Sequence, residues 1–209
     1  MGPRRWLNHG VDAEAWDARY RDSELVWSRG PNQFVEAELA GTPPGRALDL
    51  AAGEGRNAIW LAERGWQVTA VDFSQAGLDK GRTLAGDLHV EWVCADATTW
   101  TGDGSYDVCV VAYLQLAGDE RRAAVRGAFG SLRVGGTLLL VAHDSTNLTE
   151  GVGGPQDPDV LMTAEEVLGD LDGERFDVAR AERVARHVVQ PDGGTRTAYD
   201  ALVRLVRRD

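Results

Sequence analysis

Lysine, cysteine and histidine are scarce in this chain of 209 residues. Lys80 is the only lysine, so almost all of the 22 basic side chains are arginines. The 33 acidic side chains outnumber them and give a net charge of −11. Proteins that bind nucleic acids or anionic membrane surfaces usually present a basic face. The charge therefore argues against both of these partners.

The few metal-binding side chains show no ligand pattern. The two cysteines, Cys94 and Cys109, lie in apolar runs, and we expect both to be buried reduced thiols. There is no C-x-x-C motif, and the four histidines are far apart in the sequence. Because metal sites need closely spaced ligands in a recurring pattern, the sequence predicts no metal.

Long hydrophobic runs are also absent. No run approaches the length of about 18 apolar residues that a membrane-spanning helix needs. Residues 1–30 contain no continuous apolar stretch that could serve as a signal peptide. We therefore expect a cytoplasmic protein, and the chain length suits one domain with a sizeable core.

Apolar runs typical of strands alternate with helical patterns through most of the chain. The expected strands are Arg46–Ala51, Gln67–Asp72, Val90–Cys94, Tyr106–Ala112 and Thr137–Ala142. The expected helices are one from Asp12, one from Pro31 or Asn32, Glu54–Arg64, one capped by Ser74 that runs to about Leu84, and one capped by Asp119. Strands separated by helices indicate a parallel sheet that is doubly wound, with helices on both faces.

The last third of the chain has a different pattern. A long loop at residues 144–159 is followed by a capping box at Thr163–Glu166, which opens a short helix. Two strand-like segments, Phe176–Val189 and Thr195–Val206, are joined by the turn Pro191–Gly194. The α/β sheet is therefore expected to have seven strands, mostly parallel, and to end in an antiparallel hairpin.

We divide the expected single domain, residues 1–209, into three parts. Residues 1–41 form N-terminal cap helices, residues 46–144 form a core that binds a cofactor, and residues 145–209 form a substrate loop and the C-terminal hairpin. The centre of this organisation is the strand, small-residue turn and helix at residues 46–57. Such a turn makes a ligand cradle at the carboxyl end of a parallel strand.

Dinucleotides and S-adenosylmethionine are the two ligand classes that use such a cradle. The dinucleotide pattern G-x-G-x-x-G/A aligns on Ala51, Gly53 and Arg56, and its third position needs a tiny residue. Glu54 would also oppose a pyrophosphate. S-adenosylmethionine has no phosphate and carries a cationic sulfonium, which suits the acids at or near the strand ends. These acids are Asp49, Glu54, Asp72 and Asp96.

Four motifs in this order resemble those of class I S-adenosylmethionine-dependent methyltransferases. Leu48–Asn57 is similar to the first motif, D-x-G-x-G-x-G, with Ala51 in place of its first glycine. Val71–Ser74 and Cys94–Ala97 resemble the second and third motifs, and Leu132–Gly136 resembles the turn before the fifth strand. The resemblance covers about residues 12–206 and implies a Rossmann-like methyltransferase fold whose seventh strand inserts antiparallel between strands five and six.

A finer resemblance lies upstream of the first motif. Trp16–Tyr20, Val26–Ser28 and Pro31–Asn32 are similar to the tellurite-resistance and thiopurine S-methyltransferase branch, which also often carries G-R-N-A, as at Gly55–Ala58. The resemblance implies that the N-terminal helices fold over the cofactor and that an aromatic side chain near Trp27 contacts its methionine part.

The resemblance also implies residue roles. Asp72 would bind the ribose hydroxyls and Asp96 the adenine amino group, while Asp49 either orders the loop amides or touches the ligand. The residues expected to bind S-adenosyl-L-methionine are Trp27, Asp49, Ala51, Gly53, Gly55, Arg56, Asn57, Asp72, Phe73, Asp96, Ala97 and Ala112. Arg29 is either a partner of the cofactor carboxylate or a solvated loop charge.

The catalytic residues are less defined, with Tyr113 and His143 as the candidates because they follow the fourth strand and end the fifth. No Ser-His-Asp set is evident, which favours a soft or already deprotonated acceptor that needs no general base. The sequence thus predicts transfer of a methyl group to a small molecule, such as a thiol, a halide or a metalloid oxyanion. The alternatives are an NAD-dependent oxidoreductase and a non-catalytic protein that binds S-adenosylmethionine. The sequence names neither the acceptor nor an oligomeric state.

Overall fold

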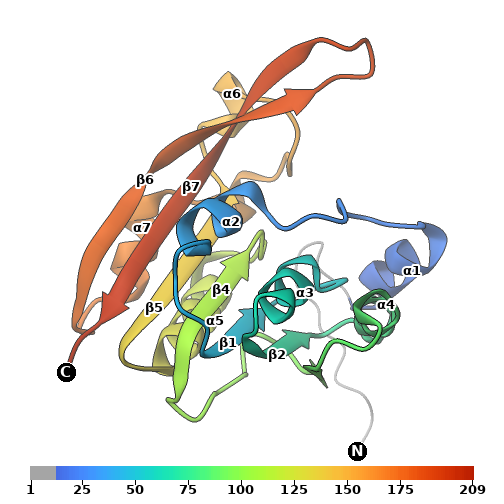
Figure 1. Ribbon diagram of the computed structural model, residues 1–209. Coiled ribbons are helices and arrows are strands. Elements are labelled where there is room, and N and C mark those ends of the chain that lie inside the picture. The colour runs from blue at the N-terminus through green and yellow to red at the C-terminus, as the bar shows by residue number, and fades with distance from the viewer. Residues whose placement is uncertain (1–12) are drawn as a thin grey trace, which may run out of the picture.

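The computed structural model describes residues 13–209 as one sheet with helices on both faces (Figure 1). The strands are β1 (Arg46–Leu50), β2 (Gln67–Asp72), β3 (Val90–Cys94), β4 (Tyr106–Ala112), β5 (Leu132–His143), β6 (Phe176–Val189) and β7 (Thr195–Arg207). The helices are α1 (Ala13–Asp22), α2 (Gln33–Leu39), α3 (Arg56–Glu63), α4 (Gln75–Ala85), α5 (Gly118–Gly130), α6 (Asn147–Glu150) and α7 (Ala164–Asp170), with a 3₁₀ turn, η1, at Pro158–Val160. The predictions for residues 1–12 lie outside the described residues.

The strand order is β3-β2-β1-β4-β5-β7-β6. Strands β1 to β5 pair in parallel, and β7 pairs antiparallel with both β5 and β6. The predicted fold class is therefore confirmed, including the insertion of the last strand. The β5–β7 register places Asp200 directly opposite His143. This pairing brings two residues that are far apart in the sequence to the same end of the sheet.

Alternating side chains of the central strands build a separate core on each face of the sheet. In β1, Leu48 and Leu50 belong to the cluster that contains Phe129 of α5 and Val167 of α7. Ala47, one position earlier, belongs to the cluster that contains residues of α2 and α3. Because side chains of a strand alternate between faces, an almost wholly apolar strand needs cover on both. The helices supply that cover.

Two predicted boundaries are wrong for identifiable reasons. Helix α3 begins at Arg56 rather than at Glu54, because Gly55 precedes it in the left-handed conformation, with φ of 75°. Strand β5 begins at Leu132 rather than at Thr137, and its pairing with β4 shifts register around the two glycines that were expected to form a turn. The predicted caps at Ser74 and Thr163 are both confirmed, but the predicted cap at Asp119 is wrong, since Asp119 lies inside α5, whose N-cap is Ala117.

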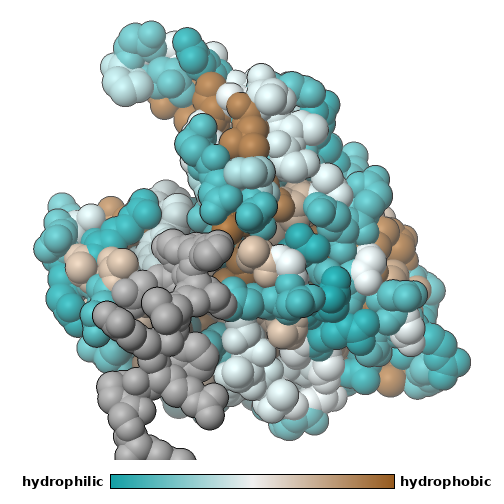
Figure 2. Space-filling view, turned by 180° about the vertical axis from the view of Figure 1, so that it is seen from behind, coloured by the Kyte–Doolittle hydropathy of each residue, from teal (hydrophilic) through white to brown (hydrophobic). Residues whose placement is uncertain are grey.

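The hairpin of β6 and β7 extends past the rest of the sheet (Figure 1). Residues 195–199 of β7 pair with β6 alone. On the face drawn in Figure 2, outside the grey residues, hydrophobic patches are small and separated by hydrophilic surface. The exposed large hydrophobic side chains of the described chain are Leu84, Val134, Val178 and Val189. None of the helices within residues 13–209 combines the length and apolarity needed to cross a membrane.

Candidate cofactor and acceptor site

The loop after β1 is a tight turn built from left-handed residues. Ala51, Gly53 and Gly55 have φ of 64°, 57° and 75°. The N–H of Ala52 donates to the carbonyl of Val71 at 3.0 Å and ties the turn to β2. Ala51 therefore keeps the backbone conformation that favours glycine, at the position where the first motif has its first glycine.

Two glycines of this loop are required by their surroundings as well as by their φ angles. A Cβ on Gly53 would lie 2.5 Å from the hydroxyl of Tyr20, and a Cβ on Gly55 would collide with the ring of Trp92. Aromatic side chains of α1 and β3 thus pack directly on the turn. The glycines let the loop pass between the sheet and the N-terminal segment.

Asp72, at the end of β2, fastens the loop from the other side. Its Oδ2 accepts the N–H of Gly53 at 2.8 Å, and its Oδ1 accepts the N–H of Ser74 at 2.8 Å. Burial raises the pKa of Asp72 to about 6, although these hydrogen bonds lower it. Each carboxylate oxygen keeps a further lone pair. Asp72 can therefore hold the loop and still accept hydrogen bonds from a ligand.

A cavity of about 540 Å³ opens beside Asp72 at the carboxyl ends of the strands. Its volume lies within the range of small-molecule sites. It is lined by Ala13, Ala51, Asp72, Phe73, Cys94, Ala95, Asp96, Ala97, Thr98, Val160 and residues 114–120. Asp96 accepts hydrogen bonds from the N–H and the hydroxyl of Thr98, both at 2.8 Å. The predicted second and third motifs therefore share one cavity.

A narrower hollow of about 60 Å³ continues from this cavity, since both are lined by Ala51, Asp72, Phe73, Leu114 and Gln115. We call it the aromatic end, because Trp16, Tyr20, Trp27 and Tyr113 line it together with Ala52, Arg56, Asn57 and Ala112. Trp16 and Trp27 stack with their ring centroids 6.3 Å apart. The N-terminal segment thus closes the aromatic end.

Glu54 departs from the prediction, because it does not join the acids along this crevice. Its carboxylate accepts the N–H groups of Val26 and Trp27 and pairs with Lys80 at 2.8 Å. The Nζ of Lys80 also donates to the carbonyls of Tyr20 and Ser23, at 2.8 and 2.6 Å. The only lysine of the chain and a buried acid therefore clamp the N-terminal segment over the loop.

Asp49 and Asn57 support the loop. The Oδ2 of Asp49 accepts the N–H of Ala58 at 3.0 Å, and burial raises the pKa of this carboxyl to about 7. Asp49 lines neither the cavity nor its aromatic end. The Oδ1 of Asn57 accepts the N–H of Asn32 at 2.9 Å, which links α3 to the start of α2. For Asp49, the geometry thus favours the first of the two predicted roles, the ordering of loop amides.

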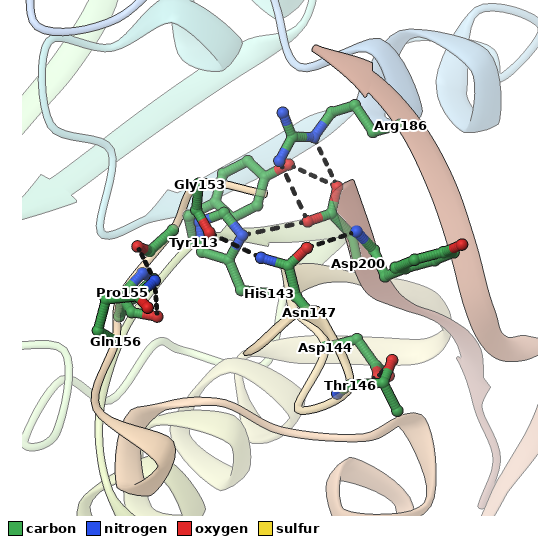
Figure 3. A network of polar contacts seen from close by, with 12 residues as sticks. Tyr113, His143, Asp144, Thr146, Asn147, Gly153, Pro155, Gln156, Arg186 and Asp200 are labelled. Carbon is green, nitrogen blue, oxygen red and sulfur yellow. Dashed lines mark hydrogen bonds and ion pairs between the residues drawn. The ribbon is translucent and has the colours of Figure 1, made fainter. Parts of the chain in front are cut away.

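Tyr113 and His143 belong to a polar network centred on Asp200 (Figure 3). The Tyr113 hydroxyl donates to Asp200 Oδ2 at 3.0 Å, and Arg186 Nε donates to the same oxygen at 2.7 Å. His143 Nδ1 lies 3.3 Å from Asp200 Oδ1, and its ring lies 4.6 Å from that of Tyr113. Burial raises the pKa of Asp200, but His143 and Arg186 outweigh it, so that this pKa lies below its usual range.

The long loop after β5 covers this network. Asn147 accepts the N–H of Tyr199 at 2.9 Å and donates to the carbonyl of Gly153 at 2.7 Å. A Cβ on Gly154 would lie 3.0 Å from His143 Nδ1. Tyr113 itself has φ of 59°, a strained conformation for a bulky residue. Such strain persists only where the surroundings enforce it, and here the buried network does so.

The sequence did not identify Arg186 or Asp200 as part of this region. One signal for Asp200 was available, namely its place in the apolar strand segment 198–203. An acid in such a segment is expected to be buried, and a buried acid needs a partner. Arg29 is exposed and lines neither the cavity nor its aromatic end. Cys109 is buried as expected, but the prediction for Cys94 is wrong, since this free thiol is exposed beside the cavity. No group of three potential metal ligands occurs within residues 13–209.

Comparisons with known proteins agree with this arrangement. The family model described as "Methyltransferase domain" matches residues 47–136. A demethylmenaquinone methyltransferase of Clavibacter sepedonicus is 39% identical over 120 residues, which are 56% of this chain and 47% of that protein. The N-methyltransferase NodS from Bradyrhizobium japonicum WM9, solved with S-adenosyl-L-homocysteine, superposes with a TM-score of 0.72 at 16% identity and covers 95% of this chain and 100% of its own.

TehB from Haemophilus influenzae superposes with a TM-score of 0.68 at 18% identity, over 94% of this chain and 67% of its own. At the level of fold this likeness agrees with the finer resemblance of the N-terminal segment. Residues 47–136 are therefore similar to a methyltransferase domain, the fold of the chain is that of S-adenosylmethionine-dependent methyltransferases, and S-adenosyl-L-methionine is the cofactor that such a domain uses. The chain spans about half the length of the curated relatives it matches, so the activity of the whole protein is a proposal.

The residues present fit this cofactor. The larger cavity is mostly apolar and carries carboxylates at Asp72 and Asp96, which suit a nucleoside. The aromatic end adds a cation, Arg56, which suits the carboxylate of an amino acid. The only lysine of the chain is paired with Glu54 and does not line the cavity. The cavity is thus chemically matched to a nucleoside joined to an amino acid.

Proposed function

We propose that the protein transfers the methyl group of S-adenosyl-L-methionine to a small-molecule acceptor. The observation that carries this proposal is the continuity of the nucleoside-sized cavity with the aromatic end, with Asp72 at their junction. The larger cavity therefore serves the nucleoside, and the aromatic end serves the reacting end of the cofactor and the acceptor. When bound, the cofactor supplies an activated methyl group and its own leaving group.

The proposed roles follow from position. Asp72 accepts hydrogen bonds from the ribose hydroxyls of the cofactor. Its adenine base is held by Phe73, Asp96 and Ala97. Ala51 offers backbone groups, while Gly53, whose N–H is held by Asp72, keeps the loop in shape together with Asp49 and Gly55. The remaining residues surround the methionine part from the aromatic end: Trp27, Arg56, Asn57 and Ala112.

Tyr113 and His143 are proposed to shape the acceptor side, and no proton transfer is assigned to them. The hydroxyl proton of Tyr113 is committed to Asp200, and burial raises the pKa of Tyr113 to about 12. At neutral pH this phenol is not a base. Methyl transfer then depends on orientation and exclusion of water, which suits a soft or deprotonated acceptor such as a thiol, a halide or a metalloid oxyanion.

Three further parts of the proposal rest on the sequence. The single domain keeps the divisions 1–41, 46–144 and 145–209. The cytoplasm is the proposed location. A small molecule, rather than a nucleic acid or a membrane surface, is the proposed partner because of the net charge of −11.

An acceptor panel tests this function. The protein is incubated with S-adenosylmethionine and thiols, halides, oxyanions or phenols, and formation of S-adenosylhomocysteine is measured. Turnover with a soft acceptor is expected, and turnover of phenols alone would overturn the acceptor class. Binding of S-adenosylhomocysteine without any turnover would favour a non-catalytic binding protein. Binding of NADH in its place would favour an oxidoreductase.

A further inference from the structure

The N-terminal segment covers both parts of the candidate site. We call residues 13–32 the strap. It contributes Ala13 to the wall of the larger cavity. Its aromatic side chains Trp16, Tyr20 and Trp27 line the aromatic end, which measures only about 60 Å³. Sites that take small molecules usually measure roughly 300–1,000 Å³. The methionine part of the cofactor and an acceptor therefore do not fit together under the strap as it lies here, and the strap has to move when they enter.

Apolar packing contributes little to holding the strap in place. Between Ala13 and Pro31, Tyr20 is the only buried residue. Helix α1 lies on the outside of the molecule against α4 (Figure 1). A segment with few buried apolar contacts opens locally at a lower free energy than the whole protein unfolds. The strap therefore depends on polar contacts with the rest of the chain.

Lys80 of α4 gathers several of these polar contacts at one point. Its Nζ donates to the carbonyls of Tyr20 and Ser23 at 2.8 and 2.6 Å. It also pairs with Glu54, a carboxylate that is almost fully buried and accepts the N–H of Trp27 at 3.2 Å. The ion pair thus holds both ends of the stretch from Tyr20 to Trp27, which carries two aromatic side chains of the aromatic end.

A second polar contact holds α1. The Oδ1 of Asp17 accepts the hydroxyl of Ser74 at 2.5 Å and the N–H of Ala76 at 3.2 Å, at the start of α4. This contact involves neither Lys80 nor Glu54. Because the two contacts hold one continuous segment, weakening either of them loosens the same strap.

We propose that the ion pair of Lys80 and Glu54 is a latch, and that its opening sets the rate at which the cofactor enters and its product leaves. When Lys80 leaves its acceptors, water takes its place and the strap moves away from the aromatic end. A bound cofactor that contacts the strap adds to the contacts of the latch, so binding and closure strengthen each other. This inference rests on the proposed function, because it concerns the exchange of the molecule that this function uses.

Acylation of amines reports the opening of the latch at one site, because Lys80 is the only lysine of the chain. With the N-hydroxysuccinimide ester of acetic acid, a free amine bonds to the acyl carbon, loses a proton and displaces N-hydroxysuccinimide. Lys80 can react in this way only after it has left its three acceptors. The α-amino group of the chain is the internal reference, and peptide mass spectrometry separates the two products.

The variants are Asp17→Ala, which loosens the strap at a distance from the latch, and the control Asp79→Ala. Asp79 is an exposed acid next to Lys80 that pairs with Arg82, so its removal matches the change in charge. We expect Lys80 to be acylated about tenfold faster in Asp17→Ala, because two hydrogen bonds no longer oppose opening, and at the wild-type rate in Asp79→Ala. Cys109 is fully buried, and its reaction with a maleimide reports unfolding of the whole protein.

The link to the cofactor is measured with S-adenosylhomocysteine. When it is present well above its Kd, it should slow the acylation of Lys80 in wild type about tenfold or more. Lys80→Met should release it about tenfold faster than wild type, because the latch is lost, as measured by stopped-flow tryptophan fluorescence.

Four results overturn the proposal. They are an unchanged acylation rate in Asp17→Ala, an acceleration there that Cys109 shares, an unchanged acylation rate when S-adenosylhomocysteine is bound, and an unchanged release rate in Lys80→Met. Failure of S-adenosylhomocysteine to bind the wild type in calorimetry contradicts the proposed function instead. The comparison of Asp17→Ala with Asp79→Ala still tests the latch in that case.

Discussion

Two regions at the carboxyl ends of the strands bury carboxylates in different ways. In the loop after β1 and β2, Asp49 and Asp72 accept N–H groups of the backbone. At the base of the hairpin, Asp200 accepts hydrogen bonds from Tyr113, just after β4, and Arg186 of β6, and it contacts His143 of β5. The first region is assembled from neighbours in sequence and in the sheet, whereas the second joins residues up to 87 positions apart.

The difference has consequences for stability and for charge. Backbone donors are neutral, so burial prevails and raises the pKa of Asp49 to about 7 and of Asp72 to about 6. Around Asp200 the donors include Arg186, and its pKa lies below the usual range. The loop therefore carries acids that are costly to ionise and able to accept further donors, while Asp200 is a fully committed anion that holds strands together.

Removal of Asp200 is the largest test of this comparison. Asp200→Ala leaves the partly buried Arg186 without its acid and Tyr113 without its acceptor, so we expect a loss of about 3–5 kcal/mol in the free energy of unfolding. Urea denaturation measures it. Asp177→Ala, an exposed acid on the same hairpin, is the control and should unfold as the wild type does. Equal stability of Asp200→Ala and wild type would show that the polar network around Asp200 does not stabilise the fold.

An effect of similar size is expected at Asp49 at high pH only, because it depends on the ionisation of this carboxyl. Its native pKa of about 7 lies above the unfolded value of 3.8, so the folded state binds the proton more tightly. Stability from this group therefore falls as the pH rises from about 4 to 7. Asp49→Asn should be more stable than wild type by up to about 4 kcal/mol at about pH 8, with the difference vanishing near pH 4. A pH-independent difference in urea denaturation would contradict this account of the loop.

The smallest change concerns the strain at Ala51. Its φ of 64° favours glycine, so Ala51→Gly should stabilise the protein by about 0.5–1 kcal/mol in urea denaturation. Ala62→Gly, within α3, should instead destabilise it by about 1 kcal/mol, because a helix interior disfavours glycine. If both glycine variants lost stability, the loop would have to be considered unstrained.

The same comparison explains what could be predicted from the sequence. Strand positions, the caps at Ser74 and Thr163 and the cradle around Asp72 follow from local patterns, because their partners are close in the chain or in adjacent strands. Two features were missed, because each depends on how distant segments pack. They are the ion pair of Glu54 and Lys80, which holds the N-terminal segment, and the polar network around Asp200. Tyr113 and His143 were identified by their place at strand ends. Their shared partner, Asp200 of β7, could not be identified without the antiparallel register of β5 and β7.

The central claim is that Asp72 stands at the junction of a cavity that binds S-adenosylmethionine. Calorimetry with S-adenosylhomocysteine on wild type, Asp72→Ala and the control Asp79→Ala, an exposed acid of the next helix, tests it most directly. We expect Asp72→Ala to bind about tenfold more weakly or worse, because two hydroxyls lose a charged acceptor, and Asp79→Ala to bind as wild type does. Equal affinity in all three proteins would contradict the claim.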